Sequence, residues 1–170
     1  MSNLSQMVQN DDAFAQRFDK GDLPMPPAKQ VAWVVCMDAR LHPEKFLGLE
    51  IGDTHIIRNA GGVASDDAIR SLAISSHLLG TKEFGVVHHT DCGMLTFTND
   101  DMRAKLKEDL GVDADDVDFL PFPDLEQSVR DDVQKIKDSP LLPPGIPVSG
   151  YVYEVETGKL REIVSGGGGN

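Results

Sequence analysis

Three short runs of apolar, largely β-branched residues constrain the fold of this chain more than any other feature. They occupy residues 31–36, 54–57 and 84–87. Continuous apolar runs of this length are typical of strands buried on both faces, which occur in parallel sheets covered by helices. Residues 68–79, between the second and third runs, carry apolar side chains at helical spacing. The alternation of buried strand and helix predicts an α/β domain with a parallel sheet.

Capping and turn residues indicate where the other elements lie. Ser65 is suited to cap the helix at residues 68–79, and Gly80 is suited to end it. Two further helices are expected at residues 102–110 and 125–136, and a fourth parallel strand at 148–155. A turn at 156–159 then leads into a short antiparallel edge strand at 160–164.

Length and composition indicate one folded domain. The chain has 170 residues, of which 40% are hydrophobic and 26% charged, so it can bury a core without disulfides. We assign this domain to residues 23–165. Residues 1–22 are expected to form a weakly amphipathic helical arm that packs on a partner subunit, and residues 166–170 a flexible tail.

The charge balance excludes some partners. A net charge of −12, from 28 acidic and 16 basic residues, disfavours nucleic acid and anionic membrane surfaces. No apolar run approaches the roughly 18 residues of a membrane span, and the N-terminus lacks the basic start and apolar run of a secretory signal. We therefore expect a cytoplasmic protein without nucleic-acid or membrane partners.

Two polar clusters follow the first and third predicted strands. Cys36, Asp38 and Arg40 come directly after the first run, and a segment with His89 and Cys92 follows the third. Because the carboxyl ends of parallel strands meet at one edge of a sheet, where ligands commonly bind, the two clusters are expected to converge there.

The residue types in these clusters suit a metal ion. Two thiols and an imidazole, from Cys36, Cys92 and His89, are donors that zinc prefers, and three protein ligands leave a fourth position open. The alternatives are two buried thiols without function or a redox dithiol, although the chain contains no Cys-x-x-Cys pair.

The spacing of Asp38 and Arg40 allows the two side chains to pair beside Cys36. The pair could simply close a strand end. Next to a metal ion, Asp38 could instead orient a water molecule while Arg40 holds it, or swing onto the metal and occupy its open position.

Three further positions are candidates for the wall of a site. Gly61, beside Gly62, allows close approach of the backbone to a ligand, although the pair could equally form a turn. His55 and His88 are candidates for a pocket wall or a proton relay.

The order Cys36-x-Asp38-x-Arg40 followed by His89-x-x-Cys92-Gly93 resembles the β-class carbonic anhydrases. The similarity extends from about residue 30 to 164 and includes the segment 58–61. It implies a parallel sheet of order 2-1-3-4 with an antiparallel edge strand. It also implies an obligate homodimer, in some members paired into tetramers, with the N-terminal helix clasping the partner subunit.

The same resemblance assigns roles to residues. Cys36, His89 and Cys92 correspond to the ligands of one zinc ion per chain, Asp38 and Arg40 to the catalytic dyad, and the Gly61 amide to a substrate contact. The implied reaction is the reversible hydration of carbon dioxide to bicarbonate by water that zinc activates.

The chain departs from the plant-type members of this family. Pro27, His55 and Ile74 stand where those members carry glutamine, phenylalanine and tyrosine, and His88 stands where many have glycine. We therefore predict Gly61, His55, Ile74 and His88 as substrate-binding residues.

These departures are similar to a small microbial branch that includes hydrolases of carbonyl sulfide. The first alternative function is therefore hydrolysis of carbonyl sulfide or carbon disulfide with release of hydrogen sulfide. The second is a non-catalytic zinc- or thiol-sensing protein in which Asp38 fills the fourth position. Trp33, Arg58 and Tyr153 also resemble a regulatory bicarbonate pocket, although core packing explains Trp33 more simply.

Overall fold

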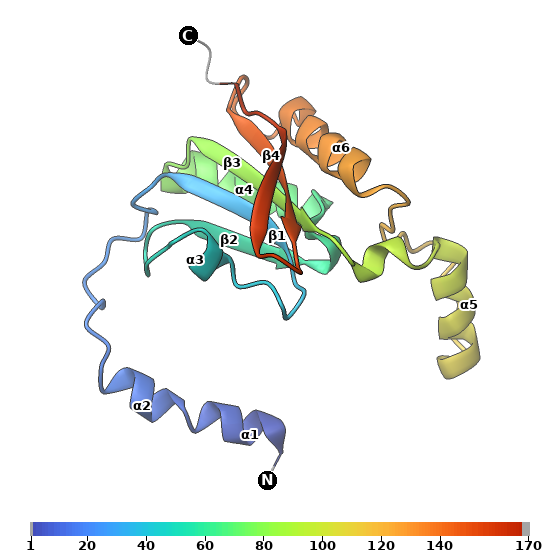
Figure 1. Cartoon of the computed structure of the whole chain (residues 1–170), viewed down its shortest axis with the longest axis horizontal. Coiled ribbons are helices and arrows are strands. Elements are labelled where there is room, and N and C mark those ends of the chain that lie inside the picture. The colour runs from blue at the N-terminus through green and yellow to red at the C-terminus, as the bar shows by residue number, and fades with distance from the viewer. Residues whose placement is uncertain (1, 168–170) are drawn as a thin grey trace.

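The three apolar runs form neighbouring parallel strands of one central sheet in the computed structural model, which describes residues 2–167. β1 (Val31–Cys36) lies between β2 (His55–Asn59) and β3 (Glu83–His89) and is parallel to both. β4 (Val148–Glu154) pairs with β3 in parallel, and β5 (Lys159–Val164) pairs with β4 in the antiparallel sense. The order β2-β1-β3-β4-β5 confirms the predicted fold class (Figure 1).

One face of the sheet is covered by two long helices, α4 (Asp66–Leu79) and α6 (Leu125–Asp138). Apolar residues of both helices pack with alternate residues of β1 and β3, and with Val148 of β4, in one buried cluster. The side chain of Ser65 accepts a hydrogen bond from the Ala68 amide, and Gly80 ends the helix in the left-handed region (φ 77°). Both capping predictions are therefore confirmed.

The opposite face of the sheet carries a second apolar cluster that includes Val35 and Val87. Its outer members Trp33, Ile56 and Tyr151 are only partly buried. Residues 2–167 therefore leave this face incompletely covered.

Several short elements were not predicted from the sequence pattern. α3 (Pro43–Phe46), η1 (Ala60–Gly62) and η2 (Gly93–Leu95) are single turns with too few residues to show a period. α5 (Asn99–Leu110) begins earlier than predicted, because Thr98 and Asp101 form a reciprocal capping box. No α5 residue is buried, and the helix extends away from the sheet (Figure 1).

The N-terminal arm was predicted as one helix, but it forms two short helices, α1 (Asn3–Val8) and α2 (Asp11–Ala15). Helices of this length gain little stability unless they pack on another element, and neither buries a residue here. Figure 1 shows the arm extending away from the sheet.

The last described residues lie close to β4. The Gly166 amide donates to Ser149 Oγ at 2.9 Å, and residues 168–170 of the predicted flexible tail lie outside the described residues. Within residues 2–167 no helix is both long and apolar enough to cross a membrane.

Candidate active site

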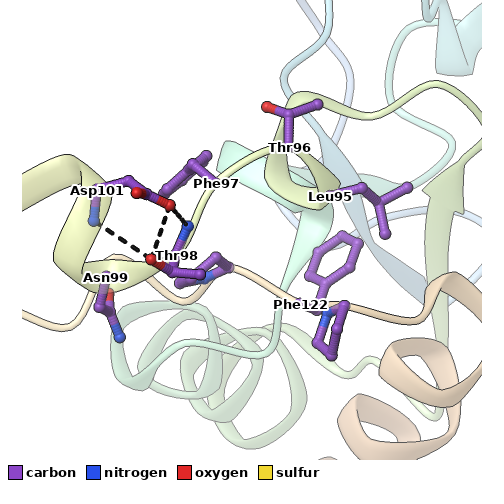
Figure 2. A pocket seen from close by; sticks show the side chains of 9 residues that line it. Leu95, Thr96, Phe97, Thr98, Asn99, Asp101 and Phe122 are labelled. Atoms are coloured by element: carbon purple, nitrogen blue, oxygen red, sulfur yellow. Dashed lines mark hydrogen bonds between the residues drawn. The ribbon is translucent and has the colours of Figure 1, made fainter.

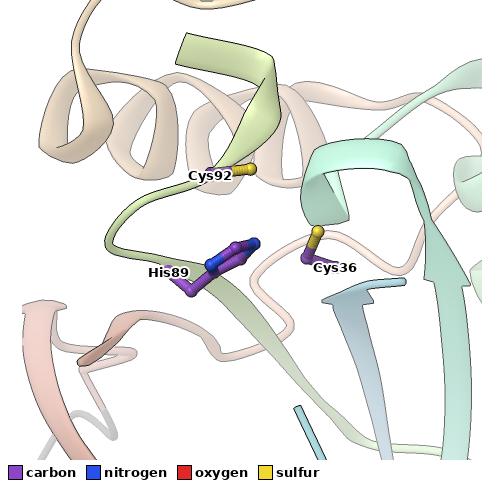
Figure 3. A group of neighbouring side chains, drawn as sticks. All are labelled: Cys36, His89 and Cys92. Carbon is purple, nitrogen blue, oxygen red and sulfur yellow. The ribbon is translucent and has the colours of Figure 1, made fainter. Parts of the chain in front are cut away.

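The two polar clusters converge at the carboxyl edge of the sheet. Cys36 is the last residue of β1 and His89 the last of β3, while Cys92 directly precedes η2. The thiol and imidazole ligand atoms of these three residues all lie within 4.8 Å of one another (Figure 3). All three residues are buried, so the predicted ligand set is assembled by the fold.

The orientation of His89 suits a metal ligand. Its Nδ1 donates to the Thr90 carbonyl at 2.8 Å, so in the neutral ring Nε2 carries the lone pair. This Nε2 is buried and has no hydrogen-bond partner among residues 2–167. A metal ion would satisfy it, and a backbone carbonyl on the other ring nitrogen is the usual support of a metal-bound histidine.

The pKa values of the two thiols also suit a site that binds a cation. A hydrogen bond from Cys92 holds the pKa of Cys36 well below its usual range, against the effect of burial and with the help of His89. The same contact and burial raise the pKa of Cys92. Two sulfurs thus compete for one proton, and a metal ion would let both ionise.

Asp38 and Arg40 form the ion pair that their spacing predicts. Arg40 Nε and Nη2 donate to the two carboxylate oxygens of Asp38 at 2.9 and 2.7 Å, and its backbone amide donates to Oδ1 at 2.8 Å. The guanidinium holds the pKa of the Asp38 carboxyl well below its usual range. Asp38 Oδ2 lies 3.7 Å from His89 Nε2, so the carboxylate borders the cluster.

Arg58 supports the same strand end from β2. Its Nε and Nη2 donate to the Cys36 carbonyl at 3.1 and 2.9 Å, and Nη2 also donates to the Asp38 carbonyl at 2.8 Å. These bonds explain why β2 continues past its apolar run. Trp33 packs in the second apolar cluster near Tyr151 (ring centroids 6.0 Å apart), and Tyr153 packs against Phe46 (4.6 Å).

A cavity of about 290 Å³ opens beside the cluster. Apart from Asp38 and the three candidate ligands, it is lined by apolar side chains and small residues: Met37, Ala60, Gly61, Gly93, Met94 and Phe97. Gly61 has a φ of 86°, and a Cβ there would come within 3.0 Å of Phe122 and 3.1 Å of Met94. A side chain at this position would therefore disturb the cavity wall.

A second hollow, of about 390 Å³, shares Phe97 with this cavity and lies at the start of α5 (Figure 2). Its polar residues Thr98 and Asp101 bond to each other in the capping box. The hollow lacks the convergent donors that the first cavity contains, so the chemistry belongs to the first.

Of the predicted substrate-binding residues, only Gly61 lines the cavity of its own subunit. His55 begins β2 at the opposite edge of the sheet and bonds to Ser75 Oγ at 2.7 Å. Ile74 lies on α4 and is exposed. The assignment of these two residues to substrate binding has no support within one subunit.

His88 is fully buried on the α6 side of the sheet. Its Nδ1 lies 2.8 Å from Ser128 Oγ and its Nε2 2.9 Å from Asp132 Oδ2. The ring stacks on Phe122 with centroids 5.1 Å apart. His88 therefore joins β3 to α6 and does not line the cavity.

Sequence reasoning missed three residues at this site. Asp91 accepts a hydrogen bond from Arg40 Nη1 at 2.7 Å, and Met94 and Phe97 form part of the cavity wall. The position of Asp91 between two predicted ligands was the available signal. Nothing in the sequence pattern distinguishes Met94 and Phe97 from core residues.

Known proteins resemble this chain in sequence and in structure. A family model described as carbonic anhydrase matches residues 31–112. β-Carbonic anhydrase 1 of Mycobacterium tuberculosis is 45% identical over 164 residues, covering 92% of this chain and 99% of that protein. A carbon disulfide hydrolase of Saccharolobus solfataricus is 40% identical over 161 residues, covering 80% of this chain and 78% of that protein. The crystal structure of a carbonic anhydrase from Streptococcus mutans superposes with a TM-score of 0.92 at 51% identity, covering 96% of this chain and 98% of that one.

Proposed function

Because this chain belongs to the β-carbonic anhydrase family, we propose that it catalyses the reversible hydration of carbon dioxide to bicarbonate. The observation that carries this proposal is the convergence of Cys36, His89 and Cys92 within 4.8 Å, beside a carboxylate and an apolar cavity. Such a site can hold a metal ion, position water and admit a small apolar molecule.

We assign one zinc ion per chain to this cluster. Two sulfurs and an imidazole nitrogen suit zinc better than magnesium or calcium, which prefer oxygen. Two observations are consistent with a bound cation. His89 Nε2 is buried without a hydrogen-bond partner among residues 2–167, and the two thiols are joined by a hydrogen bond that lowers the pKa of Cys36 and raises that of Cys92. When bound, zinc supplies hydroxide at neutral pH, because it lowers the pKa of water from about 15.7 to about 7.

Asp38 has the geometry to orient the reacting water. It is a carboxylate at neutral pH, with a pKa that the hydrogen bonds from Arg40 lower further, and Oδ2 faces the cluster. This oxygen can accept the hydrogen bond of the attacking water and leave a lone pair of that water directed at the carbon of carbon dioxide. Arg40 keeps the carboxylate in this orientation through two hydrogen bonds.

The cavity wall suits a neutral linear substrate. Met37, Met94 and Phe97 offer no charge to carbon dioxide, whereas the bicarbonate product is an anion that such a wall does not retain. The Gly61 amide remains our proposed contact for a substrate oxygen.

Hydrolysis of carbon disulfide or carbonyl sulfide is the second candidate, because a 40% identical relative bears the name carbon disulfide hydrolase. These molecules are linear carbon electrophiles like carbon dioxide, so the same ligands serve both reactions. The preference for one of these substrates must therefore come from the cavity wall. Met94 and Phe97 line that wall, whereas His55 and Ile74 do not, so Met94 and Phe97 are the first residues to mutate.

One comparison of substrates tests the proposal. We would measure catalytic efficiency for carbon dioxide by stopped flow, and for carbonyl sulfide and carbon disulfide by sulfide release, on one zinc-counted preparation. We expect carbon dioxide to be preferred by at least about tenfold. A preference for either sulfur compound would establish the second candidate, and bound zinc without any turnover would indicate a zinc- or thiol-sensing protein.

We further propose a cytoplasmic homodimer, which could pair into a tetramer, with the arm of residues 1–22 packed on the partner. The support is the set of exposed apolar side chains on the arm, which comprises Leu4, Met7, Val8, Phe14 and Phe18. The partly covered sheet face at Trp33 and Tyr151 is a further surface for a second copy.

A further inference from the structure

Asp91 lies between the candidate ligands His89 and Cys92 and has no role in the function proposed above. Its side chain is exposed (78%), and it does not line the cavity. Even so, two of its oxygens are bound to one guanidinium group. Arg40 Nη1 donates to Asp91 Oδ2 at 2.7 Å, and Arg40 Nη2 donates to the Asp91 carbonyl at 3.0 Å.

These contacts give Arg40 partners at the ends of two different strands. Together with its two bonds to the Asp38 carboxylate, the guanidinium makes four hydrogen bonds, nearly its full set of five N–H donors. Asp38 follows β1 and Asp91 follows β3. Arg40 therefore bridges the two strand ends that supply the candidate metal ligands.

The backbone of Asp91 is also unusual. Its φ of 55° lies in the left-handed region, which aspartate and asparagine tolerate better than most residues but at a cost that glycine does not incur. Glycine would be the simpler residue for this turn. The turn nevertheless contains an aspartate, and the carboxylate and carbonyl of this aspartate are the two groups that contact Arg40.

A single ion pair could not hold Arg40 as firmly. The Arg40 side chain is half exposed (48%), and exposed pairs fix side chains weakly unless several charges form a network. Asp38 and Asp91 together provide that network, and both raise the pKa of Arg40 above its ordinary value.

We infer that Asp91 is a positioning residue for the proposed reaction: it anchors Arg40 to the turn between the two ligands and so fixes the orientation of the Asp38 carboxylate. The inference deepens the proposed function and rests on it. Asp91 itself touches neither the cavity nor a ligand atom of the cluster, so it acts only through Arg40.

Two variants test the carboxylate of Asp91, and a third variant elsewhere serves as the control. Asp91→Gly removes the carboxylate and relieves the backbone, so it should fold and bind zinc as the wild type does. Asp91→Asn keeps a neutral acceptor and a residue that tolerates this φ. Asp109→Asn removes the same charge from an exposed pair with Lys105 (2.9 Å) and serves as the control.

For Asp91→Gly we expect kcat for carbon dioxide to fall about tenfold, in the range measured for outer partners of metal sites. KM should change less than about twofold, because Asp91 does not line the cavity. Asp91→Asn should recover part of the loss, to within about threefold of wild type, because a neutral acceptor bonds more weakly than a charged one. Asp109→Asn should match the wild type.

A readout that does not depend on turnover accompanies the kinetics. Nitrogen NMR of the Arg40 guanidinium should show slow rotation of the Nη1 group in the wild-type protein and faster rotation in Asp91→Gly, because that variant loses the partner of Nη1 and keeps both bonds of Nη2. Zinc content should be equal in both proteins. Unchanged Arg40 signals, or a kcat of Asp91→Gly within about twofold of wild type, would overturn the inference. A wild-type protein that does not hydrate carbon dioxide would refute the proposed function instead, and the NMR comparison would still decide whether Asp91 anchors Arg40.

Discussion

His88 and His89 are adjacent in the chain, but their side chains lie on opposite faces of β3. His88 is bound by Ser128 and Asp132 of α6, whereas His89 faces Cys36 and Cys92. Because side chains alternate along a strand, this doublet supplies one residue to the core and one to the proposed zinc site.

Loss of the Asp132 carboxylate should destabilise the protein, because it leaves the buried Nε2–H of His88 unpaired. We expect Asp132→Ala to lower the free energy of unfolding by about 1–3 kcal/mol. The matched control is Asp131→Ala, the exposed neighbour whose carboxylate accepts a hydrogen bond from Gln127, for which we expect less than about 0.5 kcal/mol. Urea denaturation measures both, and equal effects would show that the His88 contact contributes nothing specific.

Asp38→Asn should separate orientation of water from metal binding. Zinc content should stay at the wild-type level, while catalytic efficiency falls about 10- to 100-fold. Asp53→Asn alters a carboxylate of similar exposure (20% against 19%) that pairs with Lys29 away from the site, and it should leave activity unchanged. If Asp38→Asn lost its zinc, the carboxylate would have to be a ligand.

Among individual residues, the clustering of the three candidate ligands and the Asp38–Arg40 pair could be predicted from sequence, and the contacts of Asp91 and Asp132 could not. Cys36 and His89 end the neighbouring strands β1 and β3, so the sheet brings them together, and the turn that follows β3 adds Cys92. Asp91 and Asp132 act through contacts between distant segments, for which the sequence contains no period. Their roles become visible only with side-chain geometry.

At the scale of elements, β1, β3 and β4 were predictable because most of their residues are buried. The runs at 54–57 and 84–87 underestimate β2 and β3, which continue into polar residues such as Arg58 and His88. The apolar run ends before these residues, but the strand pairing continues through them. Their polar side chains form hydrogen bonds with Cys36, Ser128 and Asp132. The arm was predicted as one helix because its apolar spacing does not reveal the break near Asn10.

α5 depends on its caps more than any other long helix, since it buries no residue. The Thr98 amide donates to the Asp101 carboxylate and lowers the pKa of Asp101. A carboxyl whose pKa is lower in the folded state stabilises it above the unfolded value of about 3.9 and loses this effect as the pH falls through the folded value. We therefore expect amides of α5 to lose protection from hydrogen exchange below about pH 4, before those of β1. Equal loss in both elements would contradict this.

At the scale of the whole molecule, the arm and the partly covered sheet face expose the apolar surface on which the proposed dimer rests. The rings of Phe14 and Phe18 lie 5.5 Å apart on the arm and are exposed, and a large exposed apolar surface commonly marks an interface. The sheet order, in contrast, is a property of one chain and agrees with the order that the family resemblance implied.

Changing both rings should weaken the dimer. We expect the double variant Phe14→Ser, Phe18→Ser to shift from dimer to monomer in light scattering at micromolar concentration. Arg17→Ser, on the same arm, removes only a bond to the Ala13 carbonyl and should remain dimeric. A dimer that survives the double variant would place the interface elsewhere, with the sheet face at Trp33 the next surface to test.

Metal titration tests the central claim most directly. Zinc would be removed with a chelator under reducing conditions and returned stepwise to the wild-type protein and to Cys36→Ser, with carbon dioxide hydration measured at each step. We predict that wild-type activity rises linearly and saturates at one zinc per chain, while Cys36→Ser binds zinc weakly and stays inactive. Activity that persists without zinc, or full activity of Cys36→Ser, would contradict the assignment of the Cys36, His89 and Cys92 cluster as the catalytic metal site.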